Sequence, residues 1–236
     1  MSPLSRRMLD AYGGEATWRA ARSVRARLSV GGVLLRSKRP LHSVWRDLNV
    51  LANVAEPKAR LEPFDRFGRT LVLEGHDVSV VGRKGVVRAR RSARDVFPGG
   101  RRALFWDELD VGYFLGYAMW NYLVLPALLL RDDVEWRDVS KSTLEARLPR
   151  HLPTHCEIQR FHVDPQTGLL RQHDYTAELF GQWARAAHLV IEHARADGLT
   201  YPSKRRVKAG SPTSRTLIWI DLHDYDVLRR SDAQAS

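Results

Sequence analysis

Apolar and polar residues alternate along most of this chain, which is the pattern of half-buried β-strands. Glycine, proline and other turn-forming residues separate the alternating stretches and predict short antiparallel connections. Residues 23–37 are predicted to form a strand, a turn at Gly31-Gly32 and a second strand. Further strands are predicted at 44–51, 58–62, 69–81 with a turn at Gly75-His76, 85–91, 134–138, 142–148, 154–163, 169–178, 200–208 and 215–227. Residues 183–196 favour neither helix nor strand clearly.

Helices are predicted at the N-terminus and in the middle of the chain. Ser2 and Pro3 form a good helix start, and residues 1–21 should contain two short helices separated by Gly13-Gly14. Residues 107–130 should form one long helix. Its core, Val111–Leu130, is a run of twenty residues without a charge, sixteen of them apolar.

This apolar run permits more than one interpretation. Twenty uncharged residues are long enough to cross a bilayer. Against a membrane span, the run contains Gly112, Gly116, Asn121 and Pro126, and no cluster of basic residues flanks it to set an orientation. A buried helix, apolar on all sides, is the more ordinary interpretation. Such a helix can also line a ligand cavity, because small-molecule pockets have mostly apolar, aromatic walls.

The elements together predict an α+β fold that is mainly β. We expect a large curved antiparallel sheet, a half-barrel or incomplete barrel, wrapped around the central apolar helix. At 236 residues the chain is expected to be a single domain spanning 1–236, with its N-terminal helices at 1–21 and its cavity-covering helix at 107–130.

Two passages resemble the LolA-like superfamily of lipoprotein carriers and lipid-binding proteins. They are FHVDPQTGLLRQHDY (161–175) and DGLTYPSKRRV (197–207), and AYGGEATWRAARSVRARLSV near the N-terminus is similar to bacterial relatives of unassigned role. The resemblance implies a half-barrel of about eleven strands whose concave face holds an acyl chain or another apolar ligand. It also favours a strand for residues 183–196. The family's carriers are exported, whereas the N-terminus here shows no apolar signal segment, so we expect a cytoplasmic protein.

Composition narrows the classes of function. The single cysteine, Cys156, excludes an intramolecular disulfide. The net charge of +11 comes from basic residues that cluster at 83–102 and 204–208. Such clusters can bind phosphates, but no nucleic-acid motif accompanies them, and we expect no specific nucleic-acid partner. The absence of G-x-S-x-G, P-loop and G-x-G-x-x-G motifs argues against the common hydrolase, nucleotide and dinucleotide chemistries.

Candidate catalytic residues gather in the C-terminal half of the chain. Strand alternation places His173 and Tyr175 on one face with Arg171, and Asp174 on the other; Asp221, His223 and Tyr225 share a face with Trp219. A histidine with an aspartate to orient it is a common acid–base pair. The alternative is that all of these side chains lie solvated on the convex face. Histidine spacing does not support a metal site, and no cofactor is expected.

The sequence therefore predicts a protein that binds a hydrophobic small molecule, lipid-, polyketide- or terpene-like, between the sheet and the central helix. The predicted ligand-binding residues are aromatic: Tyr113, Phe114, Tyr117, Trp120, Tyr122 and Trp219. The alternative is an enzyme on the same scaffold, a cyclase or isomerase that uses His173, Asp174, Tyr175, Asp221 and His223.

Overall fold

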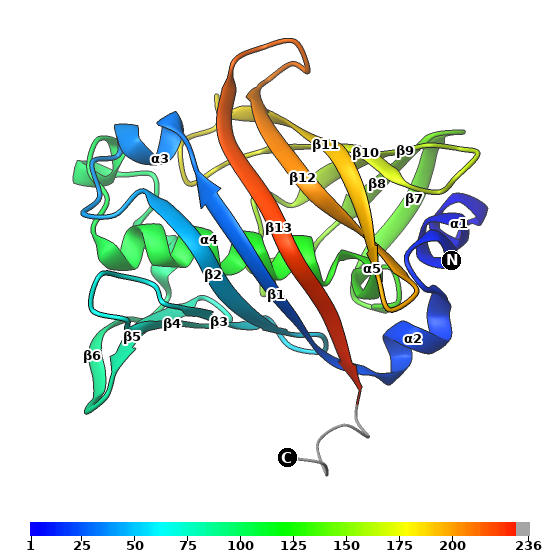
Figure 1. Ribbon diagram of the computed structural model, residues 1–236. Coiled ribbons are helices and arrows are strands. Elements are labelled where there is room, and N and C mark those ends of the chain that lie inside the picture. The colour runs from blue at the N-terminus through cyan, green and yellow to red at the C-terminus, as the bar shows by residue number, and fades with distance from the viewer. Residues whose placement is uncertain (230–236) are drawn as a thin grey trace.

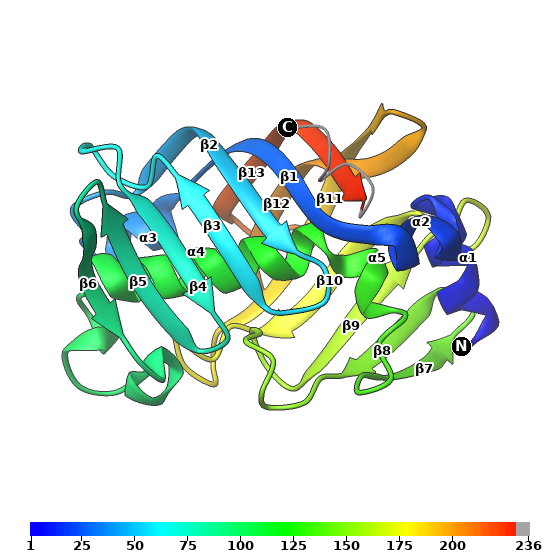
Figure 2. The same ribbon diagram turned by 90° about the horizontal axis from the view of Figure 1, so that it is seen from below.

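The computed structural model describes residues 1–229, and one curved, unclosed antiparallel sheet runs through them (Figures 1 and 2). Its thirteen strands lie in the order β6 (Gly85–Arg90), β5 (Asp77–Gly82), β4 (Thr70–Glu74), β3 (Lys58–Glu62), β2 (Val44–Asn53), β1 (Ala21–Gly31), β13 (Thr216–Arg229), β12 (Leu199–Ala209), β11 (Arg185–Ala196), β10 (Leu170–Thr176), β9 (Ile158–Val163), β8 (Thr143–Arg147) and β7 (Glu135–Ser140). The first and last strands pair at the centre of the sheet. The predicted fold class, a mainly β half-barrel, is confirmed.

Two strand predictions are wrong in part. Residues 33–37 do not return as a strand but form the short helix α3 (Val33–Ser37). At Gly32 the backbone passes directly against β13 instead of turning back. A Cβ atom at this position would lie 2.1 Å from the carbonyl oxygen of Leu217, so only glycine fits there. Strand β9 begins only at Ile158, and residues 154–157 form a loop that is buried except at Glu157. Residues 183–196, which the pattern left open, contain strand β11 as the family resemblance favoured.

The N-terminal helices agree with the prediction. Helix α1 (Pro3–Ala11) begins at Ser2, whose side chain accepts a hydrogen bond from the Ser5 amide. Helix α2 (Gly14–Ala20) follows after Gly13. Helix α1 packs against β7 and β8, so these helices cover one end of the half-barrel (Figure 2).

The central apolar segment lies inside the curve of the sheet (Figure 2). Helix α4 (Glu108–Leu123) is buried at every position from Leu109 to Leu123. The predicted single helix over 107–130 is interrupted after Leu123, and α5 (Leu125–Leu128) follows as a separate turn. Pro126 explains the break, because proline has no amide hydrogen to continue the hydrogen-bond ladder and it crowds the preceding turn. Among residues 1–229, no helix combines the length and the apolar character needed to cross a membrane.

Two glycines let α4 approach the sheet closely. A Cβ atom on Gly112 would lie 2.4 Å from Leu71 Cδ1, and one on Gly116 would lie 3.1 Å from Leu73 Cβ. The two glycines are four residues apart and therefore lie on one face of the helix. That face packs on β4, and the backbone of α4 approaches β2 to β6 most closely. The side chains on the opposite side of the helix, such as Tyr122, contact strands β10 to β12.

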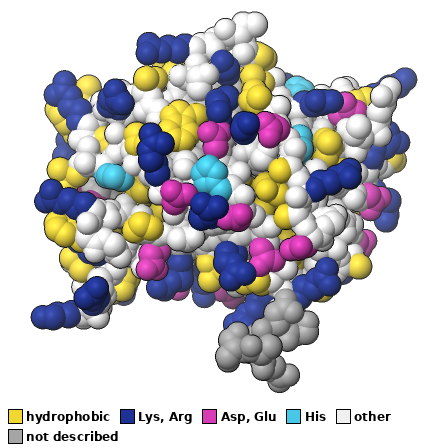
Figure 3. Space-filling view, in the orientation of Figure 1, with side chains coloured by type: hydrophobic (Ala, Val, Ile, Leu, Met, Phe, Trp, Pro, Cys, Tyr) yellow, Lys and Arg dark blue, Asp and Glu magenta, His cyan; other side chains and the backbone are white. Residues whose placement is uncertain are grey.

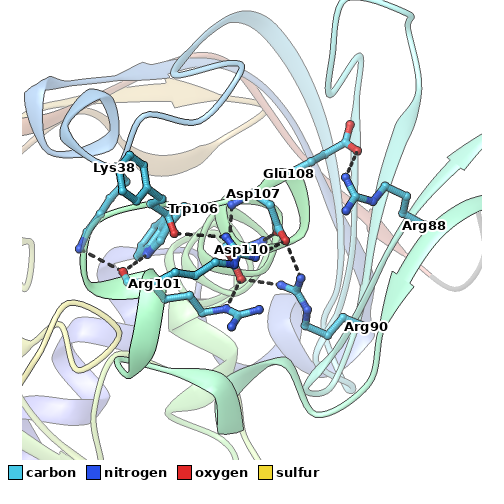
Figure 4. A network of polar contacts seen from close by, with 10 residues as sticks. Lys38, Arg88, Arg90, Arg101, Trp106, Asp107, Glu108 and Asp110 are labelled. Carbon is cyan, nitrogen blue, oxygen red and sulfur yellow. Dashed lines mark hydrogen bonds and ion pairs between the residues drawn. The ribbon is translucent and has the colours of Figure 1, made fainter.

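Arginine side chains fix the start of α4 (Figure 4). Asp107 and Asp110 form a reciprocal capping box, in which each carboxylate accepts a hydrogen bond from the backbone amide of the other residue. Asp110 is fully buried and also accepts from Arg90 and from Arg102, the latter at 2.7 Å. Much of the basic cluster at 83–102 is therefore engaged in anchoring this helix.

We expect Gly112→Val to destabilise the protein by about 1–3 kcal/mol, because the added side chain has no space against Leu71. The free energy of unfolding, measured in urea, checks this. Gly99→Val is the matched control, since nothing lies within 4 Å of a Cβ atom there and its φ of −70° suits any residue. Equal stability of the two variants would contradict close packing of α4 on β4.

Candidate functional site

The concave face of the sheet from β9 to β12 carries buried polar side chains. Gln159 on β9, His173 on β10, His188 on β11 and Arg205 on β12 all point inward and are at most 3% exposed. An interior strand surface is normally apolar, because a buried polar group loses its hydration. This concentration in one part of the core marks a candidate site.

A hydrogen-bonded group of aromatic rings links this surface to α4. The two ring nitrogens of His155, in the loop before β9, contact the hydroxyls of Tyr117 at 3.0 Å and Tyr122 at 2.6 Å. The Tyr122 hydroxyl also lies 3.0 Å from that of Tyr175, whose ring stacks on His155 at 3.9 Å. Burial lowers the pKa of His155 to about 3, so its ring is neutral and has one donor and one acceptor for the two tyrosines.

The other two histidines are less well satisfied. His173 Nε2 lies 2.6 Å from Gln159 Oε1 and must donate to it, which leaves Nδ1 as an acceptor with no partner among residues 1–229. Neither ring nitrogen of His188 has a hydrogen-bond partner within the described chain, although its ring packs on Tyr122. Burial holds the pKa values of both rings well below the usual range, so both are neutral. We call Tyr117, Tyr122, His155, Gln159, His173, Tyr175 and His188 the tyrosine–histidine cluster.

Arg205 lies beside this cluster. Its guanidinium stands over the Tyr122 ring at 5.2 Å, and its Nη2 atom donates a long hydrogen bond of 3.5 Å to the Tyr122 carbonyl oxygen. Its Nε and Nη1 atoms have no partner among residues 1–229. Burial lowers its pKa, but an arginine remains charged in a protein. A buried guanidinium that has no carboxylate partner lowers the free energy of unfolding, because the charge has lost its hydration.

Two pockets flank the cluster along the same strands. The outer pocket has a volume of about 350 Å³, and Arg185 is the only charged residue of its lining: Leu34, Phe114, Tyr175, Ala177, Phe180, Trp183, Ala184, Arg185, Ala186, Val207, Ala209, Gly210, Leu217 and Ile218. The inner pocket, of about 20 Å³, is bounded by residues that include Tyr12, Met119, Tyr122, Arg205, Ile220 and Tyr225. The two pockets are neighbours along β12 and β13. On β12, Val207 borders the outer pocket and Arg205 the inner one; on β13, Ile218 borders the outer pocket and Ile220 the inner one.

Solved structures share this architecture across nearly the whole chain. A LolA superfamily protein from Nitrosomonas europaea aligns with a TM-score of 0.51 and 10% identity, covering 99% of this chain and 96% of its own. A DUF1329 family protein from Desulfovibrio piger aligns with a TM-score of 0.52 and 15% identity, covering 95% and 90%. A domain named for outer membrane lipoprotein sorting, from Vibrio parahaemolyticus, aligns at 0.51 and 8% identity, covering 97% and 94%. The fold is LolA-like. No family model matches the sequence, and no curated protein matches it.

The LolA-like half-barrel separates the predicted catalytic residues. His173 and Tyr175 face inward together, as predicted, but Arg171 is exposed because the register of β10 shifts between Leu170 and Gln172. Asp174 lies on the outer side, where its carboxylate contacts His162 Nε2 at 2.8 Å. It therefore cannot orient His173.

Asp221 and His223 also lie away from the cluster, on the outer face of β13. Asp221 accepts a hydrogen bond from Arg206 at 2.6 Å, and the exposed His223 contacts Ser29 Oγ at 2.9 Å. Tyr225 is buried, so the prediction that it shares their face is wrong. The cause is a bulge, since Arg27 pairs with Asp224 while Leu28 pairs with Leu222. Charged side chains of both signs are intermixed on this outer face (Figure 3).

The predicted ligand-binding aromatics have different surroundings. Phe114 lines the outer pocket and Tyr122 the inner one. The Tyr113 hydroxyl contacts His76 Nδ1 at 2.7 Å, and the Trp120 indole donates to the carbonyl oxygen of Asn53 at 2.8 Å, so both serve the packing of α4 on the other half of the sheet. Tyr117 contacts His155 within the cluster. Trp219 is partly buried on the face opposite Ile218 and Ile220 and borders neither pocket.

Sequence reasoning missed Arg205, His155, Gln159 and His188. Arg205 stands in the basic cluster at 204–208, yet Ser203, Arg205 and Val207 are buried while the residues between them are exposed or partly exposed, and this alternation identifies the inward face. His188 is buried with Ala186 on β11. For His155, alternation over the predicted strand 154–163 indicates one face shared with Gln159 and Phe161, although His155 itself lies in a loop.

Two buried histidines of the cluster allow a matched test of stability in ligand-free protein. We expect His155→Leu to cost about 2–4 kcal/mol, because it leaves buried tyrosine hydroxyls without their partner. His188→Leu should cost nothing and gain up to about 1 kcal/mol, because it removes a buried imidazole that has no partner. Urea unfolding of both variants measures this difference. Equal losses in the two variants would show that His188 has a structural role like that of His155.

Proposed function

We propose that this protein binds a hydrophobic small molecule in the outer pocket, between α4 and the concave face of β10 to β13. The observation that carries the proposal is an apolar hollow of about 350 Å³ which adjoins buried, unsatisfied polar groups. Ligand sites commonly combine an apolar wall with a few convergent polar groups. The likeness to the LolA superfamily, whose members include lipoprotein carriers and lipid-binding proteins, supports the same class of ligand.

The other large hollow of the protein suits an apolar ligand less well. It measures about 520 Å³ and is bordered by charged side chains, among them Arg94, Glu157 and Glu178. Arg94 and Glu178 already form an ion pair there. An apolar molecule in that place would have to displace the hydration of several charges. The outer pocket is therefore the site we propose.

Two further expectations from the sequence stay predictions. The first is a cytoplasmic location. The second is that the protein has no specific nucleic-acid partner. The ion pairs that arginines of the basic cluster form with Asp107 and Asp110 support this expectation, because a paired arginine is less available to bind a phosphate.

Filling the outer pocket should abolish ligand binding. Ala186 lines this pocket on β11, and we expect Ala186→Phe to weaken binding of a neutral apolar fluorescent dye at least tenfold, because the ring occupies the space of the ligand. Titration of dye fluorescence measures the affinity. Val139→Phe is the control, since Val139 is exposed on β7 and does not border the pocket. Unchanged dye affinity in Ala186→Phe would place the binding site elsewhere.

A second candidate function is a cyclase or isomerase reaction on the bound molecule. One observation favours it: the bare Nδ1 of His173 and the free nitrogens of His188 are neutral and buried beside Tyr175, which borders the outer pocket. Neutral imidazoles can accept protons from a substrate. We rank this function second because Asp174 and Asp221 point outward and leave both histidines without a carboxylate to orient them.

For the enzyme candidate, we expect His173→Ala to reduce turnover by about 10²–10⁴-fold while ligand affinity stays within a few-fold of the parent. The experiment incubates the parent and the variant with an extract of host metabolites and follows conversion by mass spectrometry. His223→Ala is the control, because His223 is exposed on the outer face. If the parent binds metabolites and converts none, the protein is a binding protein only.

A further inference from the structure

Arg205 has an unusual position among the basic residues of this chain. It is 2% exposed, and the two flanking side chains that point outward, Lys204 and Arg206, pair with Glu192 and Asp221. Each of these outer cations has a carboxylate within 2.6 Å. Arg205 instead keeps two of its three nitrogens free of hydrogen bonds within the described chain.

The groups around Arg205 cannot supply the missing acceptor. Burial has the largest effect on its pKa, followed by the tyrosines at 12, 122, 225 and 175, and no carboxylate of residues 1–229 forms an ion pair with it. The Tyr12 hydroxyl accepts from the Leu170 amide, and the Tyr225 hydroxyl donates to the Leu123 carbonyl oxygen. The Tyr122 hydroxyl belongs to the network around His155. These hydroxyls are committed to other partners, so the charge of Arg205 is uncompensated.

Other unpartnered polar groups lie in the same region of the interior. On the neighbouring strand, both ring nitrogens of His188 lack a partner in the part of the chain that the structure describes, and so does the buried Ser203 Oγ, two residues before Arg205. The rings of His188 and Tyr122 are in contact, and the guanidinium stands over the same Tyr122 ring. One cation and several neutral hydrogen-bonding groups are what a buried anion requires.

The space beside Arg205 is small, and it lies close to the apolar pocket. The inner pocket of about 20 Å³ can hold a group of about the size of one water molecule. Val207, which borders the outer pocket, is two residues from Arg205 along β12, a distance of roughly 7 Å. A ligand with an apolar body in the outer pocket can therefore reach the guanidinium with a short polar end.

We propose that Arg205 binds the carboxylate of an amphiphilic ligand whose apolar body occupies the outer pocket. This inference rests on the proposed function and names its ligand class: a long-chain or polycyclic carboxylic acid. A carboxylate oxygen next to a guanidinium accepts a charge-assisted hydrogen bond from it, which is stronger than a bond between neutral groups. His188, whose ring contacts the Tyr122 ring beneath the guanidinium, offers a further donor to the second carboxylate oxygen.

The test compares three ligands of equal chain length: a fatty acid, its methyl ester and an alkyl phosphate. Each displaces a neutral apolar dye from the parent protein. We expect the acid to bind about 10- to 100-fold more tightly than the ester, as for a hydrogen-bonded charged group. Arg205→Met should remove this preference and keep ester affinity, because methionine fills similar apolar space without a charge. Arg206→Met, at the neighbouring outward position, should keep the preference.

Each other outcome overturns the inference in a distinct way. Equal affinity of acid and ester for the parent would show that the head group is not recognised. A preference that survives in Arg205→Met would place the anion elsewhere, and a preference for the phosphate would replace the carboxylate as the head group. If none of the three ligands displaces the dye, the proposed function fails as well. If Arg205→Met folds poorly, Arg205→Gln tests the same loss of charge with a polar side chain. The comparison of acid with ester in the parent protein tests recognition of the carboxylate without any variant.

Discussion

The structure depends on the need to bury a helix that is apolar on every side. Helix α4 is covered from Leu109 to Leu123, and no single flat layer can cover a cylinder. A strongly curved sheet meets this requirement, and the helix packs on β2 to β6 through Gly112 and Gly116. The buried carboxylate of Asp110, bound by arginines, then fixes the start of the helix against the sheet edge. The shape of the half-barrel and the position of its axis both follow from this packing.

The same packing divides the sheet into two halves with different interiors. Strands β2 to β6 meet the glycine face of α4 and have an apolar core with Leu61, Leu71 and Leu73 fully buried. Strands β9 to β13 face the tyrosine side of the helix and keep two pockets and a set of buried polar groups.

The buried polar side chains lower the stability of the ligand-free protein. Buried imidazole and guanidinium groups without partners oppose folding, whereas His155, held by two tyrosines, does not. In such an arrangement a ligand that supplies the missing hydrogen bonds gains binding free energy without having to order the protein first. His155 and His188 are both neutral and fully buried. His155 stabilises the packing through its tyrosine partners, whereas the packing gives no comparable role to His188.

The sequence by itself determined the elements that depend on local pattern. Alternation and turns predicted most strands, Ser2 and Pro3 predicted the first helix, and the uncharged run at 111–130 predicted the buried helix. The family resemblance added the strand at 183–196. Alternation also predicted that His173 and Tyr175 share one face, and the structure shows that this face is the inward one.

Only the tertiary structure decided which side chains meet. Bulges in β10 and β13 changed the face of Arg171 and Tyr225, and a bulge depends on the pairing of two strands, which one strand's sequence does not contain. His155 joined the cluster from a loop, and Arg205 turned inward from a basic stretch that looks solvated when read alone. Burial is a property of the whole packed chain, and so the site appears only when strands distant in sequence are brought around α4.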